Sequence, residues 1–220
     1  MEYGLNTLPE AVQAVVWAAA IPHWFDEPFL AALLGQESMA KPPAVAGWPA
    51  LLQQTFVEPF PGHGYNIHER SRAVLLERLW QDDPARVWEL SRRAADYCAR
   101  QEPSDPAWTI ERIYHLLVSE PDKGADQLVG TGWHWQNSPN YAYDLVEALA
   151  RAAREHVDAG RLAGRGRAWV YYWYAHLDTI YYRYSSAKEY LAQIDLDTDT
   201  DPFLVAGLWS QPGGEVPMGA

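Results

Sequence analysis

The chain has 220 residues, which is enough for one large domain or two small ones. Its composition excludes a wholly disordered chain, because 48% of the residues are hydrophobic and 11 Trp and 13 Tyr are present. A single Cys excludes an internal disulfide, and a formal net charge of −12 disfavours nucleic acid and anionic membranes as partners. The longest apolar run, residues 14–21, is too short for a membrane span, and the acidic N-terminus differs from a signal peptide. We therefore expect a cytoplasmic protein.

The first 82 residues predict three helices followed by a β-hairpin. Asp26 is placed to cap the second helix and Gly35 to end it. A third helix is expected from about Trp48 to Gln54, with its large apolar side chains facing inward. The segments TFVEPF and YNIHE favour β-structure, and PGHG between them predicts a turn. Three helices followed by a hairpin are the layout of a winged helix, which we assign to residues 1–82.

Residues 83–194 predict a series of helices joined by short breaks. Three of the helices are expected to start at an N-cap residue followed by proline, at 83–84, 105–106 and 138–139. The glycine-rich segment GRLAGRGR predicts a break before a long helix over residues 168–193. Serial helices of this size suggest an array of antiparallel helical hairpins, as in tetratricopeptide-like repeats. The predicted fold is therefore mainly α, with a flexible acidic and Gly/Pro-rich tail over residues 195–220. The apolar segment FLVAGLW inside this tail could dock on the body of the protein or on a partner.

No pattern in the sequence indicates a catalytic, cofactor or metal site. The histidines are scattered, H-E-x-x-H is absent, and the acidic run 195–201 lacks the Gly and Glu of a calcium loop. Cys98 lies on the apolar face of a predicted helix, which indicates a buried, inert thiol. The third helix has no Lys or Arg to contact DNA, and Arg70, Arg72 and Arg78 are expected to pair with acidic neighbours on a solvated face.

The stretch WVYYWYAHLDTIYYRY, residues 169–184, has more aromatic residues than one helix face can bury. Positions 169, 173, 177, 180 and 184 follow helical spacing and are expected in the core. The surplus favours a groove or patch that binds a protein partner, although burial between neighbouring helices is the alternative. The partner-binding candidates, which include two tryptophans on a predicted turn, are Trp133, Trp135, Tyr171, Tyr172, Tyr174, Tyr181 and Tyr182.

The segment LLQQTFVEPFPGHGYNIHERSRAVLLERLWQDDPARVWELSRRAADYC resembles the winged-helix segment of STAND-class signalling NTPases, which include the NB-ARC and MalT-like regulators. AAAIPHWFDEPFLAALLG resembles the first helices of that segment, and WTIERIYHLL resembles the start of the helical superstructure that often follows it. The resemblance covers roughly residues 8–120, with a looser helical likeness up to 194.

This resemblance assigns a role to His68. In NB-ARC-type proteins an MHD-like motif at the same joint contacts the β-phosphate of bound ADP, and Ile67-His68-Glu69 matches it, with Glu69 in place of Asp. The chain has no G-x-x-x-x-G-K-[ST] loop, so it is not expected to bind or hydrolyse ATP alone. His68 would then contact phosphate on a partner in trans, or it would only fix the corner between strand and helix.

The resemblance implies a non-catalytic interaction and regulatory module, an adaptor that acts with an NTPase or effector in trans and holds no cofactor. Two other hypotheses stay open. One is a DNA-binding transcriptional regulator that uses the winged helix, and the other is an enzyme with an unrecognised site.

Overall fold

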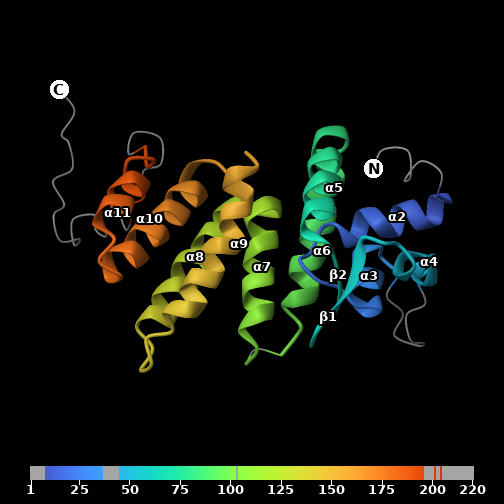
Figure 1. Ribbon diagram of the computed structural model, residues 1–220, viewed down its shortest axis with the longest axis horizontal. Helices are drawn as coiled ribbons and strands as arrows, with labels where there is room; N and C mark the ends of the chain where they lie inside the picture. The colour runs from blue at the N-terminus through green and yellow to red at the C-terminus, as the bar shows by residue number, and fades with distance from the viewer. Residues whose placement is uncertain (1–7, 37–44, 103, 196–200, 202–203, 205–220) are drawn as a thin grey trace. The chain divides into compact units, whose positions relative to one another are not determined.

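The computed structural model describes residues 8–36, 45–102, 104–195, 201 and 204, and the chain is mainly helical with one two-stranded antiparallel sheet (Figure 1). It divides into two compact units, Met1–His115 (unit 1) and Leu116–Ala220 (unit 2). The predicted boundary after residue 82 lies inside unit 1, because the helix that follows it packs against an early helix. Among the described residues, no helix has the length and apolar character needed to cross a membrane.

Unit 1 begins with α2 (Glu10–Ala19), α3 (Glu27–Leu33) and α4 (Trp48–Leu52). The predicted cap of α3 is confirmed, since the Asp26 side chain accepts a hydrogen bond from the Phe29 N–H at 2.8 Å. Gly35 ends this helix with φ of 69°. The third helix is shorter than predicted, and of its apolar side chains only Leu51 is fully buried, while Trp48 and Leu52 are half-buried.

The predicted hairpin is confirmed. Strands β1 (Val57–Phe60) and β2 (Gly64–Ile67) pair antiparallel, with Val57 opposite Ile67 and Phe60 opposite Gly64. The hairpin is tied to the helices by two backbone hydrogen bonds between Phe25 and Tyr65, at 2.7 and 2.9 Å. Gly64 has φ of 93°, and a Cβ there would lie 2.6 Å from the Phe25 carbonyl oxygen, so the close approach requires glycine.

The hairpin leads into α5 (Glu69–Asp82), α6 (Pro84–Cys98) and α7 (Pro106–Ser119). Asp83 caps α6 as predicted, with its carboxylate 3.0 Å from the Arg86 N–H. Cys98 is buried, as expected for a small apolar side chain, and burial raises the pKa of its thiol. On α5, Leu75, Leu76 and Leu79 are buried, whereas Val74 is 54% exposed.

Unit 2 contains α8 (Pro121–Gln136), α9 (Tyr143–Asp158), α10 (Gly164–Ile180) and α11 (Tyr184–Leu191). Consecutive helices run up and down as antiparallel hairpins (Figure 1). Helix α10 packs against α8, α9 and α11, so it forms the centre of this unit. The largest of its fully buried side chains belong to Trp169, Tyr172 and Trp173.

Three predictions for unit 2 were wrong. The proline at 139 does not start a helix, because α9 begins only at Tyr143. The single long helix is two helices, because the backbone at Tyr182 adopts φ of 60° and breaks the helical path. The tail predicted to be flexible has two buried residues in unit 2, Asp201 and Leu204. The burial of Leu204 agrees with the expectation that FLVAGLW could dock on the body, and most of the tail lies outside the described residues.

Candidate functional site

His68 lies exposed at the N-cap position of α5. Its backbone N–H donates to the Phe56 carbonyl at 2.8 Å, and its own carbonyl accepts from the N–H groups of Ser71 and Arg72. The imidazole makes no capping hydrogen bond. The main chain therefore fixes the corner between strand and helix, and the side chain faces solvent.

The predicted partner-binding tyrosines of α10 divide into two groups. Tyr172 is only 1% exposed, which rules it out as a direct contact for a partner. Tyr171 and Tyr174 are half-buried, and with Tyr190 they surround the guanidinium of Arg154 at 5.4, 5.5 and 5.7 Å from the ring centroids. These rings stabilise the Arg154 guanidinium, whose side chain is 28% exposed.

The two tryptophans predicted on a turn lie in the last turn of α8. Trp133 is half-buried and packs edge-on against Trp173, with ring centroids 5.1 Å apart. Trp135 is also half-buried. Trp133 therefore borders the core of unit 2, and both tryptophans are partly accessible.

A different set of aromatic residues is exposed. In the described part of unit 2, the large apolar side chains classed as exposed are Tyr141 (63%), Tyr181 (43%), Tyr182 (80%) and Tyr184 (49%). They lie in or beside the α8–α9 and α10–α11 connections, which the antiparallel order places at one end of the unit, the lower end in Figure 1. We name this set the tyrosine end. The sequence analysis found Tyr181 and Tyr182 and missed Tyr141. Its placement of Tyr184 in the core was wrong, because α10 ends at Ile180 and Tyr184 begins a new helix with a different inward face.

The α10–α11 turn holds Tyr182 in the left-handed backbone region. The buried carboxylate of Asp178 accepts from Arg183 Nε at 2.7 Å, and the Asp178 carbonyl accepts from the Arg183 N–H at the same distance. The Arg183 guanidinium also lies 5.0 Å from the centroid of the Tyr181 ring. A left-handed backbone costs about 1–2 kcal/mol for a residue such as tyrosine. A strained residue that is also strongly exposed suggests a functional role for this turn.

The α8–α9 turn shares both properties. Tyr141 has φ of 46°, and its N–H donates to the Ser138 carbonyl at 2.9 Å. The Ser138 hydroxyl donates to the Trp135 carbonyl at 2.7 Å, which fixes the turn to the end of α8. The Tyr141 ring stacks on Tyr143, with centroids 5.9 Å apart. Tyr141 and Tyr182 are the only non-glycine residues with positive φ in the described chain.

Unit 1 contains a buried carboxylate that the sequence analysis did not identify. Glu111 on α7 is 2% exposed, and one of its oxygens accepts from the His23 backbone N–H at 2.9 Å and from His115 Nε2 at 3.1 Å. Its other oxygen lies 2.7 Å from His23 Nδ1. The spacing of Glu111 and His115, four residues apart on one helix face, was the signal that could have found this pair.

Arg72 is buried beside this group, contrary to the prediction of a solvated arginine. Its Nε donates to the Pro22 carbonyl at 2.9 Å, and its terminal nitrogen donates to the Tyr114 hydroxyl at 2.8 Å and to the Ile21 carbonyl at 3.2 Å. Arg72 follows the helical spacing of the core leucines at 75, 76 and 79, which indicates an inward direction. Arg78 does pair with Asp82 on the surface, as predicted.

Protonation of the Glu111 group should weaken the fold in acid. Burial alone would raise the pKa of Glu111, but His23 and His115 outweigh it and hold that pKa well below the usual 4.5. Burial lowers the pKa of His115 from 6.5. Both pKa values are depressed by folding, so the unfolded chain takes up protons at higher pH than the folded chain. The stability contributed by these groups is therefore complete above pH 6.5 and is lost as the pH falls.

We expect urea midpoints of the wild-type chain to fall below pH 6.5 and to fall further below pH 4.5. The control is Glu111→Gln, whose amide oxygen can still accept from the His23 N–H and His115. This variant should keep the first decline and lack the second, because it has no carboxylate to protonate. Equal midpoint losses below pH 4.5 in both proteins would assign the acid sensitivity to other groups.

The geometry of the Glu111 group favours a structural role. Its members are buried except for His23, whose side chain is 25% exposed, and their hydrogen bonds join α7 to the segment after α2. The described residues contain no cluster of three or more His, Cys, Asp or Glu side chains arranged to hold a metal ion.

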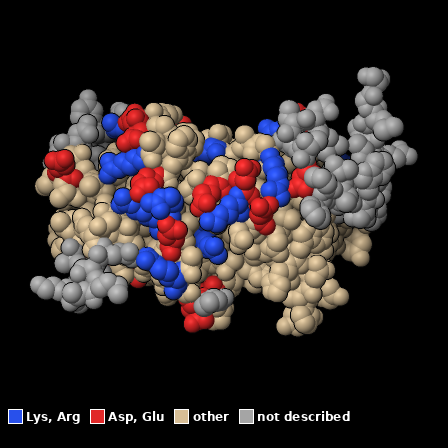
Figure 2. All heavy atoms as spheres, turned by 180° about the vertical axis from the view of Figure 1, so that it is seen from behind, with Lys and Arg blue, Asp and Glu red and all other residues tan. Residues whose placement is uncertain are grey.

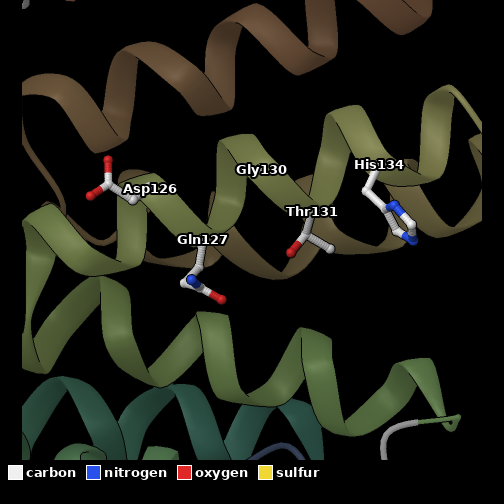
Figure 3. Close-up of a pocket in the computed structure, with 5 residues that line it drawn as sticks. All are labelled: Asp126, Gln127, Gly130, Thr131 and His134. Atoms are coloured by element: carbon white, nitrogen blue, oxygen red, sulfur yellow. The ribbon is translucent and has the colours of Figure 1, made fainter.

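A shallow hollow of about 180 Å³ lies on one face of α8 (Figure 3). Its lining comes entirely from that helix and is polar: Asp126, Gln127, Gly130, Thr131 and His134. The hollow is smaller than the roughly 300–1,000 Å³ typical of a small-molecule site. On the molecular face in Figure 2, basic and acidic side chains alternate over the described surface, and no continuous basic area is visible there.

No known relative supports the family resemblance over residues 8–120. Comparisons with protein-family models, curated proteins and solved structures found no match to this chain.

Proposed function

We propose that this chain is a non-catalytic protein-binding module and that the tyrosine end of unit 2 contacts the partner. The observation that carries the proposal is the grouping of four exposed tyrosines in two connections at one end, two of them on left-handed backbone. Tyrosine offers a large amphipathic contact area and loses little rotamer freedom on binding, which is why it is frequent in protein-binding surfaces.

The turns supply the rigidity that such a surface needs. Asp178 and Arg183 fix the α10–α11 turn, and Ser138 fixes the α8–α9 turn, so the backbone that carries the tyrosines does not have to be ordered at the moment of binding. The partner should present apolar pockets for the rings, with hydrogen-bond acceptors for the phenol hydroxyls.

The finer form of the proposal follows the family resemblance. In it, unit 1 is a winged helix, the helical hairpins of unit 2 are tetratricopeptide-like, and the partner is an NTPase or effector of STAND-type signalling. The three short helices and hairpin of unit 1 support this form, and so does the solvent-facing imidazole of His68. His68 would contact a phosphate of nucleotide bound to the partner.

The charge distribution favours a protein partner over DNA. Helix α4, which would serve as the recognition helix of a winged helix, contains no Lys or Arg, and β1 carries Glu58. Phosphate contacts dominate DNA affinity and depend on basic side chains.

The test is a triple substitution in the α10–α11 turn, Tyr181→Ser, Tyr182→Gly and Tyr184→Ser. Glycine at 182 relieves the left-handed backbone, so we expect the variant to remain folded with a thermal midpoint near that of the wild type. We expect it to lose at least about tenfold in affinity for the partner, because exposed tyrosines of this kind are typical hot spots. The measurement is quantitative affinity enrichment, followed by a binding titration with the purified partner.

The matched control is Trp88→Ser, which removes an aromatic side chain that is 50% exposed in unit 1. This control should retain the partner. Equal partner binding by the wild type and the folded triple variant would reject the tyrosine end as the contact surface. Repeating the titration with ATP, with ADP and with the His68→Ala variant tests the finer proposal. If His68 contacts a phosphate, the affinity for the partner must depend both on the nucleotide and on His68.

A further inference from the structure

The C-terminal segment places one carboxylate in the interior of unit 2. Asp201 is 3% exposed, and its Oδ2 accepts from Arg165 Nε at 2.6 Å and from the Trp169 indole N–H at 2.8 Å. Leu204, three residues later, is fully buried. Hydrogen bonds between ionised partners are shorter and stronger than neutral ones, so this contact specifically selects a carboxylate.

The residues that receive Asp201 form a preorganised site. Trp169 is completely buried in the first half of α10, which fixes the direction of its indole N–H. The Arg165 side chain is 32% exposed, and its second terminal nitrogen contacts Asp126 at 2.7 Å. Asp126 is 63% exposed and holds the guanidinium toward the site from α8. The Arg165 side of the site is therefore partly open to solvent, whereas the Trp169 side is held in place by the core.

The sequence of the segment fits this site in two ways. Asp201 precedes a proline, the same N-cap-plus-proline pattern that starts α6 after Asp83, and Leu204 is helical. Asp201 and Leu204 are both buried, so one carboxylate and one aliphatic side chain three residues apart enter the interior of unit 2 together. An acidic peptide with the spacing Asp-x-x-Leu carries the same two groups.

We propose that Arg165 and Trp169 form an exchangeable site for an Asp-x-x-Leu peptide, which Asp201 and Leu204 fill in cis. The C-terminal segment then acts as an internal competitor that keeps an acidic ligand from a partner out of the site. Its attachment to the same chain gives it an effective concentration in the millimolar range, so only a released segment or a tighter peptide can exchange. The proposal is independent of the tyrosine end, because Arg165 and Trp169 lie in the first half of α10 and Tyr181 follows its last residue.

The test uses the full chain and a fluorescent synthetic peptide of residues 195–208. Binding is followed by fluorescence anisotropy in the wild type and in the Asp201→Asn and Asp201→Asn/Leu204→Ala variants. We expect both variants to bind the peptide at least about tenfold more tightly than the wild type, since their own segments compete poorly. The Asp201→Asn variant keeps Leu204, so it can be used for the measurement if the double variant is unstable.

Two controls address the chemistry of the site. A peptide with asparagine in place of Asp201 should bind at least about tenfold more weakly, because it cannot form the charge-assisted bonds. Adding Arg165→Lys to the Asp201→Asn chain should also weaken binding, since a lysine lacks the Nε–H that reaches the carboxylate. The proposal is overturned if the folded Asp201→Asn chain does not bind the peptide, or if the asparagine peptide binds equally well.

Discussion

A methyl group added at Gly124 is expected to lower the free energy of unfolding of unit 2 by about 3 kcal/mol. A Cβ at this position would lie 2.5 Å from the Leu117 backbone nitrogen and 2.7 Å from the Leu116 carbonyl carbon. These atoms belong to the backbone of α7, so they cannot move aside by a rotamer change. The gain of about 1 kcal/mol in helix propensity from glycine to alanine is too small to offset the forced separation of α7 and α8.

The same helix supplies the control. A Cβ at Gly130 meets no atom within 4 Å, so Gly130→Ala should stabilise the protein by about 0.5–1 kcal/mol through helix propensity alone. Urea denaturation monitored by circular dichroism measures both variants. If Gly124→Ala and Gly130→Ala shifted stability in the same direction, the close approach of α8 to α7 would be refuted.

Replacing Arg72 with leucine should destabilise unit 1 by about 3 kcal/mol, because buried acceptors then lose their donors. The Pro22 and Ile21 carbonyls and the Tyr114 hydroxyl each accept a hydrogen bond from this guanidinium. Leucine fills part of the volume but cannot donate the hydrogen bonds that these buried oxygens accept from Arg72. Thermal and urea unfolding of the full chain report the loss.

Arg70 provides a matched comparison two residues earlier on α5. It is exposed, so Arg70→Leu should change the free energy of unfolding by no more than about 0.5 kcal/mol. Similar stability losses in both variants would show that Arg72 does not hold the segment after α2. Both substitutions replace arginine with leucine, so the difference between their stability losses measures the effect of burial.

Local signals in the sequence predicted the elements that depend on neighbouring residues. The side chains of Asp26 and Asp83 cap their helices as predicted, and the Pro/Gly turn produced the hairpin. These features arise from hydrogen bonds and backbone preferences within a few residues, which a single sequence can reveal.

Features that depend on residues distant in sequence were missed. Glu111 and His23 are 88 positions apart, and nothing local indicates that they meet. Tyr182 has a high propensity for regular structure, yet the Asp178–Arg183 interaction closes a turn there and divides the predicted long helix. Tyr172 was named as a partner-binding candidate, with burial between neighbouring helices as the alternative. The alternative holds for this residue, because α10 packs against α8, α9 and α11 and buries more than one face.

The Asp201 contact also affects the rates of folding and unfolding. Most of the helix pairs in unit 2 are neighbours in sequence, whereas the bond from Arg165 to Asp201 closes a separation of 36 positions. Contacts between sequence neighbours form early during folding, and a contact that closes a long loop forms late. An interaction that is absent from the transition state changes the unfolding rate and leaves the folding rate nearly constant. We therefore expect the buried aspartate to prolong the lifetime of the folded unit without delaying its formation.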